Sequence, residues 1–166
     1  MRRRRNGSTM LEAALWLPIL FGILMGTVEL ARVSYTYYTL HKILYTLARY
    51  VGTQSGINFC DSTDATLVAA KQLALRGSPD DSAPALLPGL EAGQIEVRLE
   101  RLNAETGALE QCDCSATGCD RSVGGLSPEW IVVSLPDGYP IQLSIPKLTL
   151  DAIALRPVIR VPHGGA

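Results

Sequence analysis

The segment from Ser8 to Val28, which reads STMLEAALWLPILFGILMGTV, decides how this chain of 166 residues is organised. Glu12 is the only charged residue in its 21 positions. As a helix the segment would measure about 31 Å, close to the hydrocarbon thickness of a bilayer at roughly 30 Å. The segment therefore predicts a helix that spans a membrane once.

The residues on either side of this segment predict its orientation. Arg2, Arg3, Arg4 and Arg5 precede it, and basic residues stay on the cytoplasmic side of a membrane helix. A cleaved secretory signal is the alternative, but it has a shorter apolar region and small residues before the cut. The nearest such place is 28–31, which contains Glu29. We therefore expect a cytoplasmic N-terminus and export of everything after about residue 31.

Helical periodicity continues past the apolar segment. Apolar residues recur every three or four positions on one face, whereas His41, Lys42 and Arg49 lie elsewhere; the apolar positions are Leu40, Ile43, Leu44, Leu47 and Val51. Gly52 and the run 54–56 end the pattern. One helix of about forty residues is predicted, with its first half in lipid and its second half covering an exported domain.

The remaining chain predicts an α+β fold with a short helix and a small antiparallel sheet. A helix is expected over 65–76, capped by residues 61–63 and by Gly77. Strands are expected over 95–100, 130–135 and 152–161, the last one limited by Pro157 to an edge or to two pieces. Residues 141–150 could form a strand or a loop. The predicted divisions are a cytoplasmic leader (1–7), a transmembrane helix (8–31), its exported continuation (32–52), an α+β domain (53–161) and a disordered tail (162–166).

Charge argues against nucleic acid as a partner. The net charge is −1, but without the four leading arginines the chain has 11 basic and 16 acidic residues. A phosphate backbone requires a basic face. The arginine tract could form such a patch on its own, but its position before an apolar run favours a topological signal.

Four cysteines lie on the side predicted to be exported, namely Cys60, Cys112, Cys114 and Cys119. An even number of cysteines in an oxidising compartment favours disulfides. A metal site is the alternative, because three thiols fall within eight residues, but no His is nearby. A bridge between Cys112 and Cys114 is sterically disfavoured, and we favour Cys60–Cys112 with Cys114–Cys119.

The sequence displays no set of residues suited to catalysis, and we expect no enzyme, cofactor, metal or small-molecule substrate. Ser144 and Lys147 match the Ser-x-x-Lys spacing of acylating enzymes, but Pro146 lies between them where a helix would be needed. His41 and His163 have no evident partners for proton relay.

Two glycines, a proline and a glutamate stand out within the apolar segment. Gly22 and Gly26 form a Gly-x-x-x-Gly pair, which permits close helix contact or arises by chance. Pro18 is expected to kink the helix or to remove one of its hydrogen bonds. Glu12 either reaches the headgroups or awaits a partner inside the membrane, because an isolated carboxylate in lipid costs a few kcal/mol.

The run Arg-Arg-Arg-Arg-Asn-Gly-Ser-Thr-Met-Leu-Glu, ending at Glu12, resembles the class III signal of type IV pilin-like proteins. More closely, residues 7–20 and the later Glu29-Leu-Ala-Arg32 resemble the TadE/TadG family of Flp (Tad) pilus assembly proteins. The resemblance covers residues 4–50. It implies cleavage by a prepilin peptidase between Gly7 and Ser8, which makes Glu12 the fifth residue of the mature chain.

The resemblance also implies a pilin-like α+β arrangement and a minor pseudopilin in the bacterial inner membrane, either kept there or carried into a surface pilus. Its partners would be the membrane, the prepilin peptidase, the assembly platform and other pilin-like subunits. Glu12 would meet the new amine of a neighbouring subunit. The alternative is a membrane-tethered periplasmic binding domain that never enters a pilus and depends on neither Gly7 nor Glu12.

Overall fold

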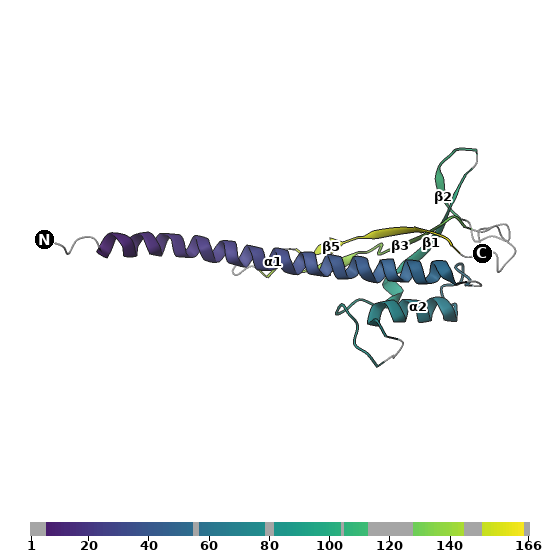
Figure 1. Ribbon diagram of the computed structural model, residues 1–166, viewed down its shortest axis with the longest axis horizontal. Helices are drawn as coiled ribbons and strands as arrows, with labels where there is room; N and C mark the ends of the chain where they lie inside the picture. The colour runs from purple at the N-terminus through teal and green to yellow at the C-terminus, as the bar shows by residue number, and fades with distance from the viewer. Residues whose placement is uncertain are drawn as a thin grey trace.

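The computed structural model describes residues 6–54, 57–78, 82–103, 105–112, 128–144 and 151–164. Its α+β fold confirms the predicted class. A long helix forms a rod, and every other element gathers around one end of it (Figure 1). The elements are α1 (Asn6–Thr53), α2 (Ala65–Arg76), the 3-10 helix η1 (Ala92–Gln94), β1 (Glu96–Leu102), β2 (Leu109–Gln111), β3 (Trp130–Ser134), β4 (Tyr139–Ile141), β5 (Ile153–Leu155) and β6 (Val158–Pro162).

Helix α1 is a single element of 48 residues that continues through Pro18. At 1.5 Å per residue it measures about 72 Å. We refer to residues 6–31 as its N-terminal half and to residues 32–53 as its domain half. The helix ends at Thr53, in agreement with the predicted stop at Gly52 and the residues that follow.

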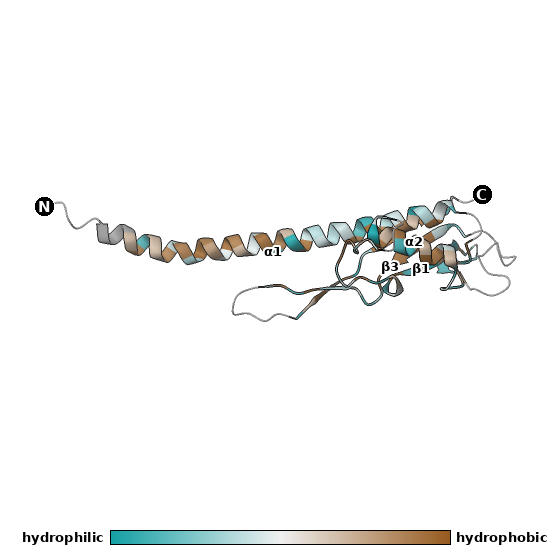
Figure 2. Ribbon diagram, turned by 90° about the horizontal axis from the view of Figure 1, so that it is seen from below, coloured by the Kyte–Doolittle hydropathy of each residue, from teal (hydrophilic) through white to brown (hydrophobic). Residues whose placement is uncertain are grey.

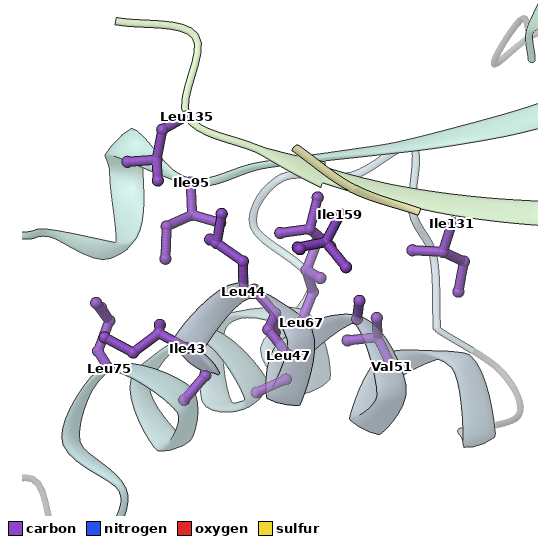
Figure 3. Close-up of a cluster of buried hydrophobic side chains, with 14 of the residues drawn as sticks. Ile43, Leu44, Leu47, Val51, Leu67, Leu75, Ile95, Ile131, Leu135 and Ile159 are labelled. Atoms are coloured by element: carbon purple, nitrogen blue, oxygen red, sulfur yellow. The ribbon is translucent and has the colours of Figure 1, made fainter. Parts of the chain in front are cut away.

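The domain half packs through the predicted face. Its apolar side chains are at most 2% exposed, namely those of Leu40, Ile43, Leu44, Leu47 and Val51. They meet side chains of α2 and of the sheet, which close over them from two sides (Figure 3). His41, Lys42 and Arg49 are exposed, as expected. The three-to-four spacing therefore located the core correctly.

Four antiparallel strands form the main sheet, in the order β2-β1-β3-β6. Its register pairs Leu99 with Ile131 and Ile131 with Val161, so these apolar side chains share one face. Helices α1 and α2 cover that face, because side chains from both helices and from the sheet form one buried cluster. On the opposite face Glu100 and Arg160 form an ion pair at 2.8 Å. The strands predicted near 95–100 and 130–135 are thus confirmed.

Helix α2 has the predicted bounds but a different N-cap. Asp64 accepts hydrogen bonds from the backbone N–H groups of Thr66 and Leu67 at 2.9 and 3.0 Å, so the cap predicted within 61–63 is wrong by one residue. Asp61 instead accepts from the hydroxyl and the N–H of Thr63, and these bonds lower its pKa. Gly77 forms the predicted C-cap at φ 68°, a left-handed conformation that favours glycine.

Pro157 divides the last predicted strand into two pieces, and the pieces join different sheets. β6 completes the main sheet, whereas β5 pairs with β4 in a separate two-stranded hairpin. Of the segment 141–150, Ile141 belongs to β4, and 145–150 lie outside the described residues.

The prediction of disorder from residue 162 onward is wrong for residues 162–164. Pro162 ends β6. The N–H of His163 donates to the carbonyl of Glu129 at 2.8 Å, and that of Gly164 to the carbonyl of Gly52 at 3.2 Å. Backbone pairing, which composition does not reveal, holds this segment against the end of α1. Residues 165 and 166 lie outside the described part.

Candidate functional site

The N-terminal half of α1 exposes nearly all of its apolar surface. Between Met10 and Leu30 the large apolar side chains are 49 to 79% exposed, and they colour this part of the rod as hydrophobic (Figure 2). Soluble proteins rarely expose apolar patches of this extent. The helix is also long and apolar enough to cross a membrane, and its most apolar window is not buried by the rest of the chain. This half therefore fits membrane anchoring, unlike the core helix of a soluble domain.

Glu12 lies near the start of this apolar surface with its side chain exposed. It forms no ion pair with any residue that the structure describes. One charged group on an otherwise apolar face needs a partner beyond the described residues, a proton or the headgroup layer. The backbone of Gly7 and Ser8 belongs to α1, and their predicted cleavage stays a prediction.

Gly22 and Gly26 lie one turn apart on the same exposed surface. A Cβ atom built on either residue would meet nothing within 4 Å. The fold of this chain therefore does not require glycine at either position. What the pair provides is a shallow surface where the backbone of another helix could approach closely, and the chance interpretation also remains.

Glu29 and Arg32 mark the point where the two halves of α1 meet. Glu29 Oε1 lies 3.6 Å from Arg32 Nη1, and the same guanidinium nitrogen donates to Ser144 Oγ at 3.5 Å. The β4–β5 hairpin therefore extends back along α1 toward the N-terminal half (Figure 1). The Glu29 side chain is 15% exposed and its Oε2 atom has no hydrogen-bond partner in the described structure. In the sequence Ser144 stands out only for its spacing to Lys147, because a contact across 112 positions leaves no local signal.

Cys60 and Cys112 are disulfide-bonded rather than free thiols. Cys114 and Cys119 lie outside the described residues, as does Lys147. The favoured pairing of Cys60 with Cys112 and of Cys114 with Cys119 therefore stays a prediction.

The described part of the domain contains a hollow and a buried lysine as candidates for chemistry. Within the described ranges no group of three His, Cys, Asp or Glu side chains is placed to hold a metal ion. One hollow between α1 and α2 is lined mainly by apolar groups, including Tyr50, Val68 and Leu73. Lys71 is 9% exposed, and burial lowers its pKa while the charge of Glu96 opposes that shift. Burial of this α2 side chain accounts for the lowered pKa.

Comparison with known proteins bears on the same helix. Residues 7–49 match the family described as TadE-like protein. This match confirms the resemblance inferred from the sequence, and it covers nearly all of α1. The searches of curated proteins and of solved structures returned no match.

Proposed function

Because α1 matches the TadE-like family, we propose that this chain is a non-enzymatic structural component, a minor pseudopilin, of a Flp/Tad-type pilus or a related secretion apparatus. Its N-terminal half crosses the bacterial inner membrane once, with the basic end in the cytoplasm and the α+β domain in the periplasm. The observation that carries the proposal is the exposed apolar half of α1 with Glu12 as its one charge before Glu29.

Glu12 explains assembly in physical terms. A carboxylate placed in lipid costs about 2.5–3.5 kcal/mol at the helix centre, and less nearer the interface. Cleavage after Gly7 would create a positive amine at Ser8, at the start of the helix. The carboxylate of one subunit and the amine of its neighbour neutralise each other, so the pair sets the register between adjacent helices. The open surface at Gly22 and Gly26 supports the same contact, since it lets helices approach.

N-terminal sequencing tests the first step of this proposal. Protein produced with a prepilin peptidase is expected to begin at Ser8, and protein produced without it at Met1. Gly7→Ala is expected to retain the leader in both. Met1 retained in both hosts by the wild-type chain would support a membrane-tethered binding domain instead.

Glu12→Gln tests the second step. The variant is expected to insert into the membrane normally, because it removes a charge from an apolar helix, yet to support few or no pili. Glu12→Asp, which keeps the carboxylate, is the matched control and should retain more assembly than Gln. Normal piliation of the Gln variant, scored by electron microscopy of sheared fractions, would contradict the role of Glu12.

A further inference from the structure

A second surface of α1 lies beyond the apolar half and is formed by Tyr35, Tyr38, Lys42, Tyr45 and Arg49. We call these five residues the tyrosine–cation stripe. Their spacing of three, four, three and four positions keeps them on one side of the helix. Tyr35 and Tyr38 are 72% and 70% exposed and Tyr45 is 43% exposed, while Lys42 and Arg49 are also exposed. The stripe lies about half a turn away from the buried face of Leu40 and Leu47.

The stripe has the composition of a contact surface. Tyrosine and arginine are enriched where proteins meet, because each combines a large contact area with a polar end. The guanidinium of Arg49 lies over the ring of Tyr45 at 5.9 Å from its centroid. This cation–π contact orients the two side chains, which lowers the entropy that binding would cost.

Charge indicates what the surface can bind. From Leu30 to Cys60 the chain has Arg32, Lys42 and Arg49 and no acidic residue, whereas from Asp61 onward it has 14 acidic and 8 basic residues. The stripe is thus a basic strip on an otherwise acidic domain. A second copy packed in parallel through the same stripe would place Lys42 against Lys42 and Arg49 against Arg49, which costs free energy.

Given the membrane topology proposed above, lipid headgroups do not reach most of the stripe. The headgroup layer adds about 5–8 Å beyond the hydrocarbon core on each side. Lys42 and Arg49 lie 11 and 18 residues past Ala31, or about 16 and about 27 Å along the helix. Headgroups can therefore contact Tyr35 but not Arg49.

We propose that the tyrosine–cation stripe binds an α-helix of a different subunit, which runs alongside α1 and presents Asp or Glu at three-to-four spacing opposite Lys42 and Arg49. This inference rests on the proposed function and names the chemistry of the partner. The apolar half and Glu12 hold subunits together in the membrane, and the stripe selects which subunit stands beside this one.

Photocrosslinking in the native host tests the proposal on the full chain. A benzophenone amino acid replaces Tyr45, and the matched control carries it at Tyr37, which is 46% exposed but lies about a third of a turn from the centre of the stripe. We expect a product at Tyr45 whose peptide, identified by mass spectrometry, belongs to another subunit and has acidic residues at that spacing. Combined Lys42→Glu and Arg49→Glu should reduce the product about tenfold or more, since like charges then face each other.

Four results would overturn the proposal: no product at Tyr45, equal yields at Tyr37 and Tyr45, a yield unaffected by charge reversal, or a product joined to lipid, to a second copy or to an acid-free segment. The crosslinker positions and the charge-reversal positions are all exposed, so the variants should fold. Thermal unfolding of each variant checks this.

A binding assay with defined probes separates this inference from the proposed function. Two synthetic amphipathic helices, identical except for Glu or Gln at three-to-four spacing, are titrated onto the full chain in nanodiscs. The Glu peptide should bind about tenfold more tightly, and added salt should reduce the difference. Equal affinities would refute the stripe while leaving cleavage and the Glu12 requirement intact. If the Glu peptide binds selectively but the chain is not cleaved and does not require Glu12, only the pseudopilin role is refuted.

Discussion

Leucines from the two halves of α1 offer a direct test of how the helix divides its roles. Leu47 is 0% exposed in the domain core, and Leu20 is 54% exposed in the apolar half. Leu→Ala removes about three methyl or methylene equivalents, at about 0.8 kcal/mol each when buried. With the cavity left behind, Leu47→Ala should lower the free energy of domain unfolding by about 3 kcal/mol. Leu20→Ala touches no core residue and should change it by less than about 0.5 kcal/mol.

Urea unfolding of the full chain in nanodiscs provides the measurement. A Trp16→Phe background leaves Trp130 as the single tryptophan, and its half-buried position on β3 reports on the domain. The two variants should share the slope of the parent and differ in midpoint. Similar losses from both substitutions, or a loss below about 1 kcal/mol for Leu47→Ala, would refute the assignment of the core to the domain half.

Three further substitutions test details of the domain by the same unfolding assay. Asp64→Ala removes an acceptor for two backbone N–H groups of α2 and should cost about 1 kcal/mol, whereas Asp64→Asn keeps an acceptor and should cost less; equal costs would argue against the cap. Gly138→Ala should cost about 2 kcal/mol, because φ is 76° and the new Cβ would lie 2.9 Å from the nearest side-chain atom. Gly93→Ala, in open space, should be nearly neutral. Burial lowers the pKa of Lys71, so between its folded-state pKa and 10.5 the unfolded chain binds more protons and stability rises with pH. Lys71→Met should therefore stabilise the domain at neutral pH, by an amount that shrinks as the pH rises through that window; a destabilised Met variant would refute this sign.

Strong periodic patterns allowed much of this fold to be predicted. The buried face of α1 follows from apolar residues at three-to-four spacing, and β1 follows from strict alternation along 95–100. Helix α2 follows from its composition and from Gly77. Each of these signals arises within a few consecutive residues, so the sequence displays it directly.

The missed elements depend on distant pairing instead. β2 is a strand of three exposed residues, which no alternation can reveal, and it exists because Leu102 and Leu109 pair across a turn. The hairpin of β4 and β5 and the bonds of His163 likewise join remote backbone groups.

The residues of the candidate site likewise include some that the sequence reveals and some that only the fold reveals. Glu12, Gly22 and Gly26 stand out in the sequence, because a charge or a glycine is unusual in an apolar run. The contact between Arg32 and Ser144 was not predictable, since only the folded hairpin brings these side chains together. The sequence placed Lys42 and Arg49 away from the apolar face of the helix, but it did not single out the tyrosine–cation stripe, because the exposure of these side chains is known only from the structure.

The continuity of α1 across the boundary between its halves has a mechanical consequence. Because no linker separates the two halves, α1 transmits rotation as a rigid rod, and any rotation of its anchored end about the helix axis turns the whole domain. One residue inserted near Thr36 would swing the domain by about 100° and raise it by about 1.5 Å, whereas seven inserted residues would raise it by about 10 Å with a net turn of only about 20°. The orientation of the domain around the axis is therefore set by helical phase rather than by the length of a tether.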